Sequence, residues 1–377
     1  MNARNTRQAR RHALRLIGAA ALALPLAAAS HAALAQSDWQ AEWNRTLEAA
    51  KKEGALAVAG SRSPDARRVM TALWKRDFPD IDLNYTVGSS TSWVPRVLAE
   101  RGVDKFLWDA FCTGPTGGFT LGQNGALDPL VGHLILPDVK DEKTWNGGFE
   151  ELFIDNAKRV AGPFVQPATV WYDEKKVAPD KVNRLGLAIL LEPEYKGKIV
   201  WQDPRIGGPG QNYSLLIHEI LGEAALRKIV VDQESVFYNS ASEATEALVR
   251  GKALFLIGVQ ASTLDQFKEQ GIGRNAKPFG NSGKVAFNGV GGMVLAIMNR
   301  PAHPNAAKIF VNWMLTKEIQ NALADADKFN SLRRDVPPHA AAGMMAIEGE
   351  KYVNTSAERI LVKKKGVRDL MKKLRPN

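Results

Sequence analysis

The chain has 377 residues, of which 45% are apolar and 24% are charged, ordinary values for a globular protein with a full core. They exclude an intrinsically disordered chain, a collagen-like repeat and a small scaffold held by disulfides. The net charge is +10, but five of the basic residues lie in the first 35 positions, which hold no acidic residue. The rest of the chain is therefore only mildly basic, and its charge does not indicate a nucleic-acid partner.

The first 35 residues predict a secretory signal peptide. Arginines between Arg4 and Arg15 precede an apolar run over 16–29, which is too short to span a bilayer comfortably. Ala33-Leu34-Ala35 then has the small-x-small pattern of a cleavage site. We expect export by the general secretory route or, because Arg10-Arg11 is a paired arginine, by the twin-arginine route. The alternative interpretation of this segment is an N-terminal membrane anchor.

The residues that most often carry catalysis or bind metals are sparse. Cys112 is the sole cysteine, so no internal disulfide can form. The histidines after position 35 are never paired at a metal-ligand spacing. The sequence has no nucleophile elbow, no His-based triad spacing and no phosphate-binding loop of the ATPase type. We therefore expect no metal, no cofactor and no enzymatic activity. The alternative is a secreted enzyme whose catalytic residues are dispersed along the chain.

The first half of the chain predicts three successive units of strand, polar loop and helix. A capping-box pattern over 37–40 opens a helix that ends near Gly54. Alternating or continuous apolar residues then predict strands over 55–59, 83–87 and 106–112, each followed by a Gly- or Ser-rich loop. This alternation predicts an α/β domain with a largely parallel sheet.

A similar pattern restarts in the middle of the chain. Strands are expected over 198–202, 253–258 and 293–298, and helices over 211–221, 240–250, 304–315, 316–326 and, with a basic face, 367–374. The second half therefore predicts further α/β structure, followed by a helical C-terminal region.

Four segments, taken together and in order, resemble a known family. They are Leu47–Val58, Tyr195–Arg205, Gly289–Gly292 with the strand that follows, and His303–Leu315 followed by Asn330–Val336. These segments are similar to the substrate-binding proteins of bacterial ABC importers, specifically the ferric-ion-type group with the type II periplasmic binding fold. The resemblance covers nearly the whole chain after the signal peptide.

The resemblance implies a two-lobed α/β fold in which each lobe has a largely parallel sheet flanked by helices. Lobe 1 would be discontinuous, made of 36–166 and 285–377, and lobe 2 would be the insert 169–283. A two-strand hinge would lie near 165–172 and 281–292, because glycines there can absorb backbone rotation. The alternative is that the glycines only form a tight turn. The expected hinge residues are Trp171, Tyr172, Gly289, Gly291 and Gly292.

In sheets of this kind, ligands bind beyond the carboxyl ends of the strands. The candidate ligand-binding residues of lobe 1 are Ser61, Arg62, Ser89, Ser90 and Thr113. Those of lobe 2 are Arg205, Gly207, Gly208, Gly210, Tyr238, Gln260 and Ser262. Free N–H groups at a helix start and an arginine fork attract anions. The alternatives are that the hydroxyls only cap helices and that Arg205 pairs with Asp203.

The expected ligand is a small organic anion such as a carboxylate, a phosphonate or a sugar phosphate. Ferric binding in this family usually needs an adjacent tyrosine pair after the strand equivalent to 253–258, but 259–262 holds no tyrosine here. Ferric iron held by a different ligand set is the alternative. The resemblance further implies a periplasmic monomer that delivers its ligand to a membrane permease driven by an ATPase. A ligand sensor would bind in the same way.

Overall fold

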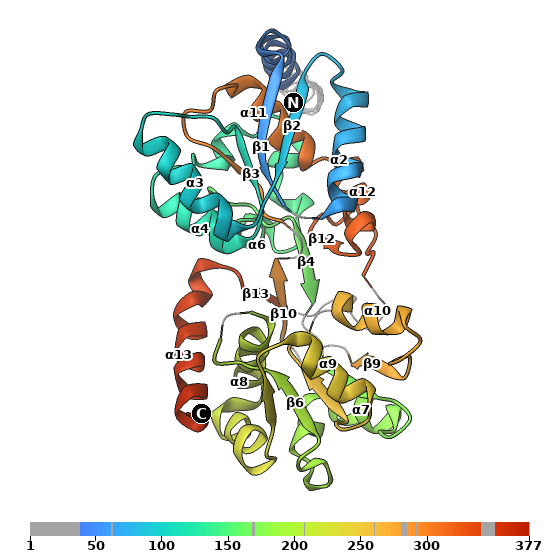
Figure 1. Ribbon diagram of the computed structural model, residues 1–377. Helices are drawn as coiled ribbons and strands as arrows, with labels where there is room; N and C mark the ends of the chain where they lie inside the picture. Colours follow the sequence, from blue (N-terminus) through green and yellow to red (C-terminus); the bar gives the residue numbers. More distant parts are fainter. Residues whose placement is uncertain are drawn as a thin grey trace, which may run out of the picture.

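The computed structural model contains two lobes joined by a narrow connection (Figure 1). It describes residues 38–61, 63–167, 170–206, 208–259, 261–279, 285–290, 293–340 and 351–376. The predicted signal peptide lies outside these residues. Within the described ranges, no helix is long and apolar enough to cross a membrane.

Lobe 1 is built on a four-stranded sheet in the order β11-β3-β1-β2. The strands are β1 (Ala55–Gly60), β2 (Asp82–Val87), β3 (Ala110–Cys112) and β11 (Ala296–Ile297), and β1 is parallel to both β2 and β3. The longer helices of the lobe are 38–53, α2 (Pro64–Asp77), α3 (Ser90–Gly102), α4 (Pro115–Gln123), α11 (Pro304–Met314) and α12 (Lys317–Asp327), and two short helices are α5 (Pro137–Lys140) and α6 (Gly148–Leu152). This sheet confirms the predicted parallel arrangement.

The core of lobe 1 joins segments that are far apart in the sequence. The ring of Trp74 in α2 lies 5.6 Å from that of Phe310 in α11 and 5.2 Å from that of Trp313, centroid to centroid. Trp74 and Phe310 are fully buried, and each such aromatic side chain removes a large apolar area from water. Lobe 1 therefore combines segments from both ends of the described chain.

Lobe 2 is built on a five-stranded sheet in the order β7-β6-β8-β5-β9. Its strands are β5 (Val170–Asp173), β6 (Ile199–Gln202), β7 (Val236–Tyr238), β8 (Phe255–Ile257) and β9 (Ala276–Phe279), with β6 parallel to β7 and β8. The principal helices are α7 (Pro179–Leu185), α8 (Pro209–Arg227), α9 (Ala241–Val249) and α10 (Ala261–Glu269).

A third sheet, in the order β12-β4-β10-β13, forms the connection between the lobes. Its strands are β4 (Phe164–Pro167), β10 (Val285–Val290), β12 (Asn330–Ser331) and β13 (Lys351–Asn354). β4 and β10 are antiparallel, with Gln166 opposite Gly289, and β13 runs parallel to β10. Gly289 therefore lies in the connection, and a third segment, β13, accompanies the two expected crossings. Gly291 and Gly292 lie outside the described residues.

Two of the predicted hinge residues are placed elsewhere. Trp171 and Tyr172 lie in β5, which pairs on both sides, with β8 and with β9. The Trp171 side chain is 1% exposed and its indole N–H donates to the carbonyl of Val259 at 2.9 Å. The prediction that they belong to the hinge is wrong, because a residue with neighbours on both sides of a central strand is fixed within its lobe.

The C-terminal helix α13 (Glu358–Leu374) is also placed differently from the prediction. Its apolar residues Ile360, Val367 and Met371 are buried in the core of lobe 2, not of lobe 1. The helix lies alongside α8 (Figure 1). It begins earlier than predicted because this apolar stripe, spaced seven and four residues apart, extends back to Ile360.

Two predicted strands of lobe 1 are shorter than expected. The apolar run over 293–298 is buried throughout, but its backbone groups pair with Thr113, Ala161 and β3 in turn instead of forming one ladder. In the run over 106–112, the buried carboxylate of Asp109 accepts the backbone N–H groups of Ala57 and His303, which ties β1 to the start of α11. The apolar composition of these two runs predicted that they are buried, but it did not predict which backbone groups they form hydrogen bonds with.

Candidate functional site

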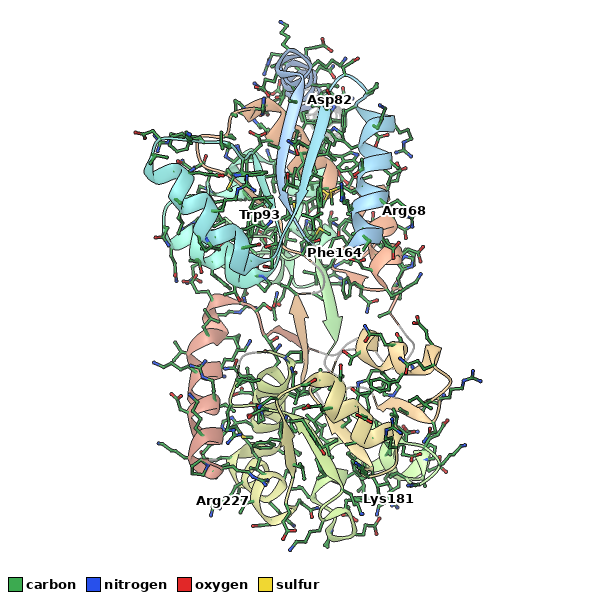
Figure 2. The ribbon with its side chains drawn as sticks, viewed as in Figure 1. Arg68, Asp82, Trp93, Phe164, Lys181 and Arg227 are labelled. Atoms are coloured by element: carbon green, nitrogen blue, oxygen red, sulfur yellow. The ribbon has the colours of Figure 1, made fainter. Side chains whose placement is uncertain are left out.

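The polar loops after β1, β2 and β3 lie at one edge of the lobe 1 sheet. Because these strands are parallel, Ser61, Ser89 and Thr113 follow strand ends that meet at the same edge. Figure 2 shows the direction: Asp82, the first residue of β2, lies at the far end of lobe 1, whereas Trp93 in α3 lies toward the connection with lobe 2. The edge therefore faces lobe 2.

A cluster of hydroxyl groups forms at this edge. The Oγ of Ser90 lies 3.0 Å from Oγ1 of Thr113 and donates to the carbonyl of Gly114 at 3.2 Å. Gly117, in the first turn of α4, permits this approach, because a Cβ there would lie 2.8 Å from the Ser90 Oγ. The structure thus brings two of the predicted ligand-binding residues, Ser90 and Thr113, into contact.

Ser61 and Ser89 have local roles. The backbone N–H of Ser61 donates to the phenol oxygen of Tyr85 at 2.8 Å. Burial raises the pKa of Tyr85 to about 12, so this phenol stays neutral. Ser89 is the N-cap of α3 and forms a reciprocal capping box with Ser92. Helix capping, the alternative reading, therefore accounts for Ser89. Arg62 lies outside the described residues.

In lobe 2, the N-terminus of α8 lies directly on the ends of β6 and β8. A Cβ at Gly210 would lie 1.9 Å from the carbonyl oxygen of Gln202, and one at Gly258 would lie 2.5 Å from the Cα of Gly210. Gly258 also has a φ of +77°, which favours glycine. The helix has a kink at Gly222, and its N-cap, Gly208, supplies no side-chain hydrogen bond. Oε1 of Gln202, at the end of β6, accepts the Gly210 N–H at 3.3 Å instead. Backbone N–H groups at such a start attract an anion.

Arg205 is engaged within the chain and does not present its guanidinium fork to this edge. Its Nε and Nη2 donate to the carboxylate of Asp203, at 2.7 Å for the Nη2 bond, and its Nη1 donates to the carbonyl of Arg375 at 2.9 Å. Burial alone would raise the pKa of Asp203, but the Arg205 hydrogen bonds outweigh it and hold the pKa below its ordinary value. The prediction of Arg205 as a ligand contact is corrected: the pairing with Asp203 is what forms.

The other predicted residues of lobe 2 are only partly placed. Tyr238 ends β7 and is half-buried against the core that contains Trp171. Ser262 lies in the first turn of α10. Gly207 and Gln260 lie outside the described residues.

The two edges flank the same connecting segments. In lobe 1, the carbonyl of Thr113 accepts the N–H of Val294, shortly after β10, at 2.7 Å. In lobe 2, the amide nitrogen of Asn212, in the first turn of α8, would lie 3.8 Å from a Cβ at Gly289 in β10. The Oδ1 of Asn212 is buried and has no hydrogen-bond partner among the described residues. Sequence reasoning missed Asn212, although its position just after a glycine-rich helix start was a usable signal.

The described residues include no group of three or more His, Cys, Asp and Glu side chains that could hold a metal. Four tyrosines are buried within the lobes: Tyr85, Tyr172, Tyr195 and Tyr213. Burial raises the pKa values of Tyr85, Tyr172 and Tyr195, which disfavours the phenolate that ferric iron requires.

No family model and no curated protein matches the sequence. Among solved structures, the Trichodesmium protein IdiA (FutA) in complex with iron and citrate has a TM-score of 0.65 at 15% identity, covering 85% of this chain and 99% of that chain. The open form of Mannheimia haemolytica ferric iron-binding protein A also has a TM-score of 0.65, at 14% identity, covering 85% and 98%. Iron-bound HitA from Pseudomonas aeruginosa has 0.59 at 14% identity, covering 84% and 99%. These likenesses confirm the predicted fold, that of the two-lobed periplasmic binding proteins.

Proposed function

We propose that this protein is the periplasmic solute-binding component of an ABC-type importer and that it captures a small organic anion between its lobes. The observation that carries the proposal is that the polar edge of the lobe 1 sheet and the polar edge of the lobe 2 sheet both lie beside the strands that connect the lobes. The edge of lobe 1 offers the Ser90–Thr113 hydroxyl pair, and that of lobe 2 offers the start of α8, where Gly208 provides no capping side chain and the Gly210 N–H donates to Oε1 of Gln202 at 3.3 Å. Hydroxyl groups and free backbone N–H groups both donate hydrogen bonds to an anion.

The proposed mechanism is capture without covalent chemistry. A ligand that docks on one lobe gains further hydrogen bonds when the other lobe closes over it, so it shifts the population toward the closed form. β4 and β10 are the elements about which closure would occur, with Gly289 in β10 able to absorb backbone rotation. The closed protein, acting as a monomer, would then deliver the ligand to a membrane permease driven by an ATPase.

A second candidate is a ferric ion carried together with an organic anion. Several structures of similar fold are named for iron, and the Trichodesmium protein is described with both iron and citrate. In that case the anion would supply ligand oxygens that the described side chains of this chain do not supply. The residues favour the organic anion as the group that the protein itself contacts.

Native mass spectrometry of the protein purified from the periplasm, before and after mild unfolding, tests the proposal. We expect a released organic anion of unchanged chemical structure. A bound mass that corresponds to iron alone would overturn the organic-anion assignment. Conversion of the released compound on return to fresh protein would instead support a secreted enzyme.

A further inference from the structure

The seam between α8 and α13 in lobe 2 is a contact between two helices that contains buried nitrogen groups. The side-chain amide of Gln211 in α8 donates to the carbonyl of Lys364 in α13 at 3.2 Å. Two turns further along α8, Glu219 forms an ion pair with Lys363 at 3.0 Å. These two contacts fix the register of the helices and place the stretch from Gln211 to Glu219 against the turn that contains Lys364.

Lys364 lies on the buried face of α13. It follows Ile360 by four residues and precedes Val367 by three, and both of these apolar residues are in the core of lobe 2. Within the described residues, no ion pair joins the Lys364 ammonium to a carboxylate. A charge in such a position costs free energy unless something compensates it.

Two further nitrogens of the seam lack partners. The Nε of Arg368, one turn beyond Lys364, is buried without a hydrogen-bond partner among the described residues. The Nδ1 of His218 in α8 is buried without a partner in the same way, and the carboxylate oxygen of Glu219 lies 3.6 Å from it, too far for a hydrogen bond. Glu219 is itself held by Lys363.

The electrostatics of the seam agree with this geometry. Burial and the neighbouring Arg368 lower the pKa of Lys364 to about 8. Both causes act against the charged form of Lys364, and the second of them is a like charge one turn away on the same helix. The charged group that acts on Lys364 is Arg368 on its own helix, whereas His218 and Glu219 lie on α8, where Glu219 pairs with the neighbouring Lys363.

We propose that this seam binds a small tetrahedral oxyanion of the phosphate or sulfate type. Lys364 and Arg368 would supply charge-assisted hydrogen bonds, and His218 a third donor from the facing helix. The site lies between two helices of lobe 2, and none of its three proposed donors is Ser90, Thr113 or a backbone N–H at the start of α8. It is therefore distinct from the ligand site proposed above and does not depend on it.

Calorimetric titration of the purified protein with inorganic phosphate, at constant ionic strength, tests the proposal. We expect Lys364→Met and Arg368→Met each to weaken phosphate binding at least about tenfold, the loss typical for one charge-assisted hydrogen bond. Lys365→Met, an exposed neighbour on the same helix, is the matched control and should bind as the parent does. The double variant Ser90→Ala, Thr113→Val should also bind phosphate as the parent does.

Amine labelling of the unmodified protein locates the site without any substitution. With mass-spectrometric readout, phosphate should slow the acylation of Lys364 severalfold and leave that of Lys365 unchanged. Equal protection of both lysines, or undiminished phosphate binding by Lys364→Met, would overturn the proposal. Loss of phosphate binding in the Ser90 and Thr113 variant alone would overturn it as well, because the oxyanion would then lie between the lobes.

Discussion

Arg359, in the first turn of α13, forms an ion pair with Glu151 of lobe 1. A second Arg359 nitrogen donates to the backbone carbonyl of Glu150 at 2.9 Å. The neighbouring Glu358 accepts the N–H of Asn156 at 2.9 Å. The body of α13 is packed in lobe 2, so these bonds attach a helix of one lobe to the other. The helix therefore acts as a strut that crosses the connection beside β4 and β10.

We expect Arg359→Met to loosen this strut. The substitution removes the ion pair with Glu151 and costs about 1–2 kcal/mol of unfolding free energy, since Glu151 is left partly buried without its partner. Small-angle scattering should show a wider distribution of lobe separations in the ligand-free variant than in the parent.

The matched control is Lys363→Met, whose ion pair with Glu219 joins α13 to α8 inside lobe 2. That variant should leave the scattering profile unchanged. Identical profiles for Arg359→Met and the parent would show that the strut does not limit lobe movement.

Much of the fold could be predicted from the hydrophobic periodicity of the sequence, because most helices and strands bury one apolar face. The strand–loop–helix order of lobe 1 and the clustering of Ser90 with Thr113 follow from parallel strands that end at one edge. The position of α13 was not readable in the same way. Its stripe of Ile360, Val367 and Met371 predicts a buried face but does not say which lobe covers it.

The role of Arg205 shows a second limit of the sequence. An arginine after a strand end suits either a ligand carboxylate or a carboxylate two residues away, and the residue types alone do not choose. The choice depends on a tertiary contact with the C-terminal segment, in which the carbonyl of Arg375 accepts a hydrogen bond from the remaining guanidinium nitrogen of Arg205. That contact joins positions 170 residues apart, which no local pattern encodes.

We predict that Gly210→Ala strongly destabilises the protein. The new Cβ would meet the carbonyl oxygen of Gln202 at 1.9 Å, so α8 must move away from the end of β6. We expect a loss of at least about 2 kcal/mol in the free energy of unfolding, measured by urea titration. Gly366→Ala is the control: nothing lies within 4 Å of its added Cβ, and a helix-interior alanine there should stabilise by about 0.5–1 kcal/mol. Equal stabilities for the two variants would contradict the close contact.

The lowered pKa of Lys364 predicts how stability depends on pH. Its pKa is about 8 in the folded protein and about 10.5 when unfolded, so the unfolded chain binds more protons between these values. Stability should therefore rise as pH increases from 8 to 10.5, by at most about 3 kcal/mol at about 1.4 kcal/mol for each pH unit. Lys364→Met should be more stable than the parent at pH 7 in phosphate-free buffer and should lose this rise, whereas exposed Lys365→Met should retain it. A parent whose stability is flat over this range would contradict the buried charge.

Substitutions at Ser90 and at Ser89 distinguish a serine that contacts the ligand from a serine that only caps a helix. Ser89 caps α3 through a reciprocal pair with Ser92, so Ser89→Ala should cost about 1 kcal/mol of unfolding free energy and change ligand affinity less than about twofold. The Ser90 hydroxyl lies in the Ser90–Thr113 pair at the edge that faces lobe 2, so Ser90→Ala should weaken binding of the co-purified ligand about tenfold with a smaller effect on stability. Isothermal titration with that ligand, paired with urea unfolding of each variant, measures both quantities. If the two variants lose affinity only in proportion to their lost stability, the hydroxyl pair is structural and the ligand lies elsewhere between the lobes.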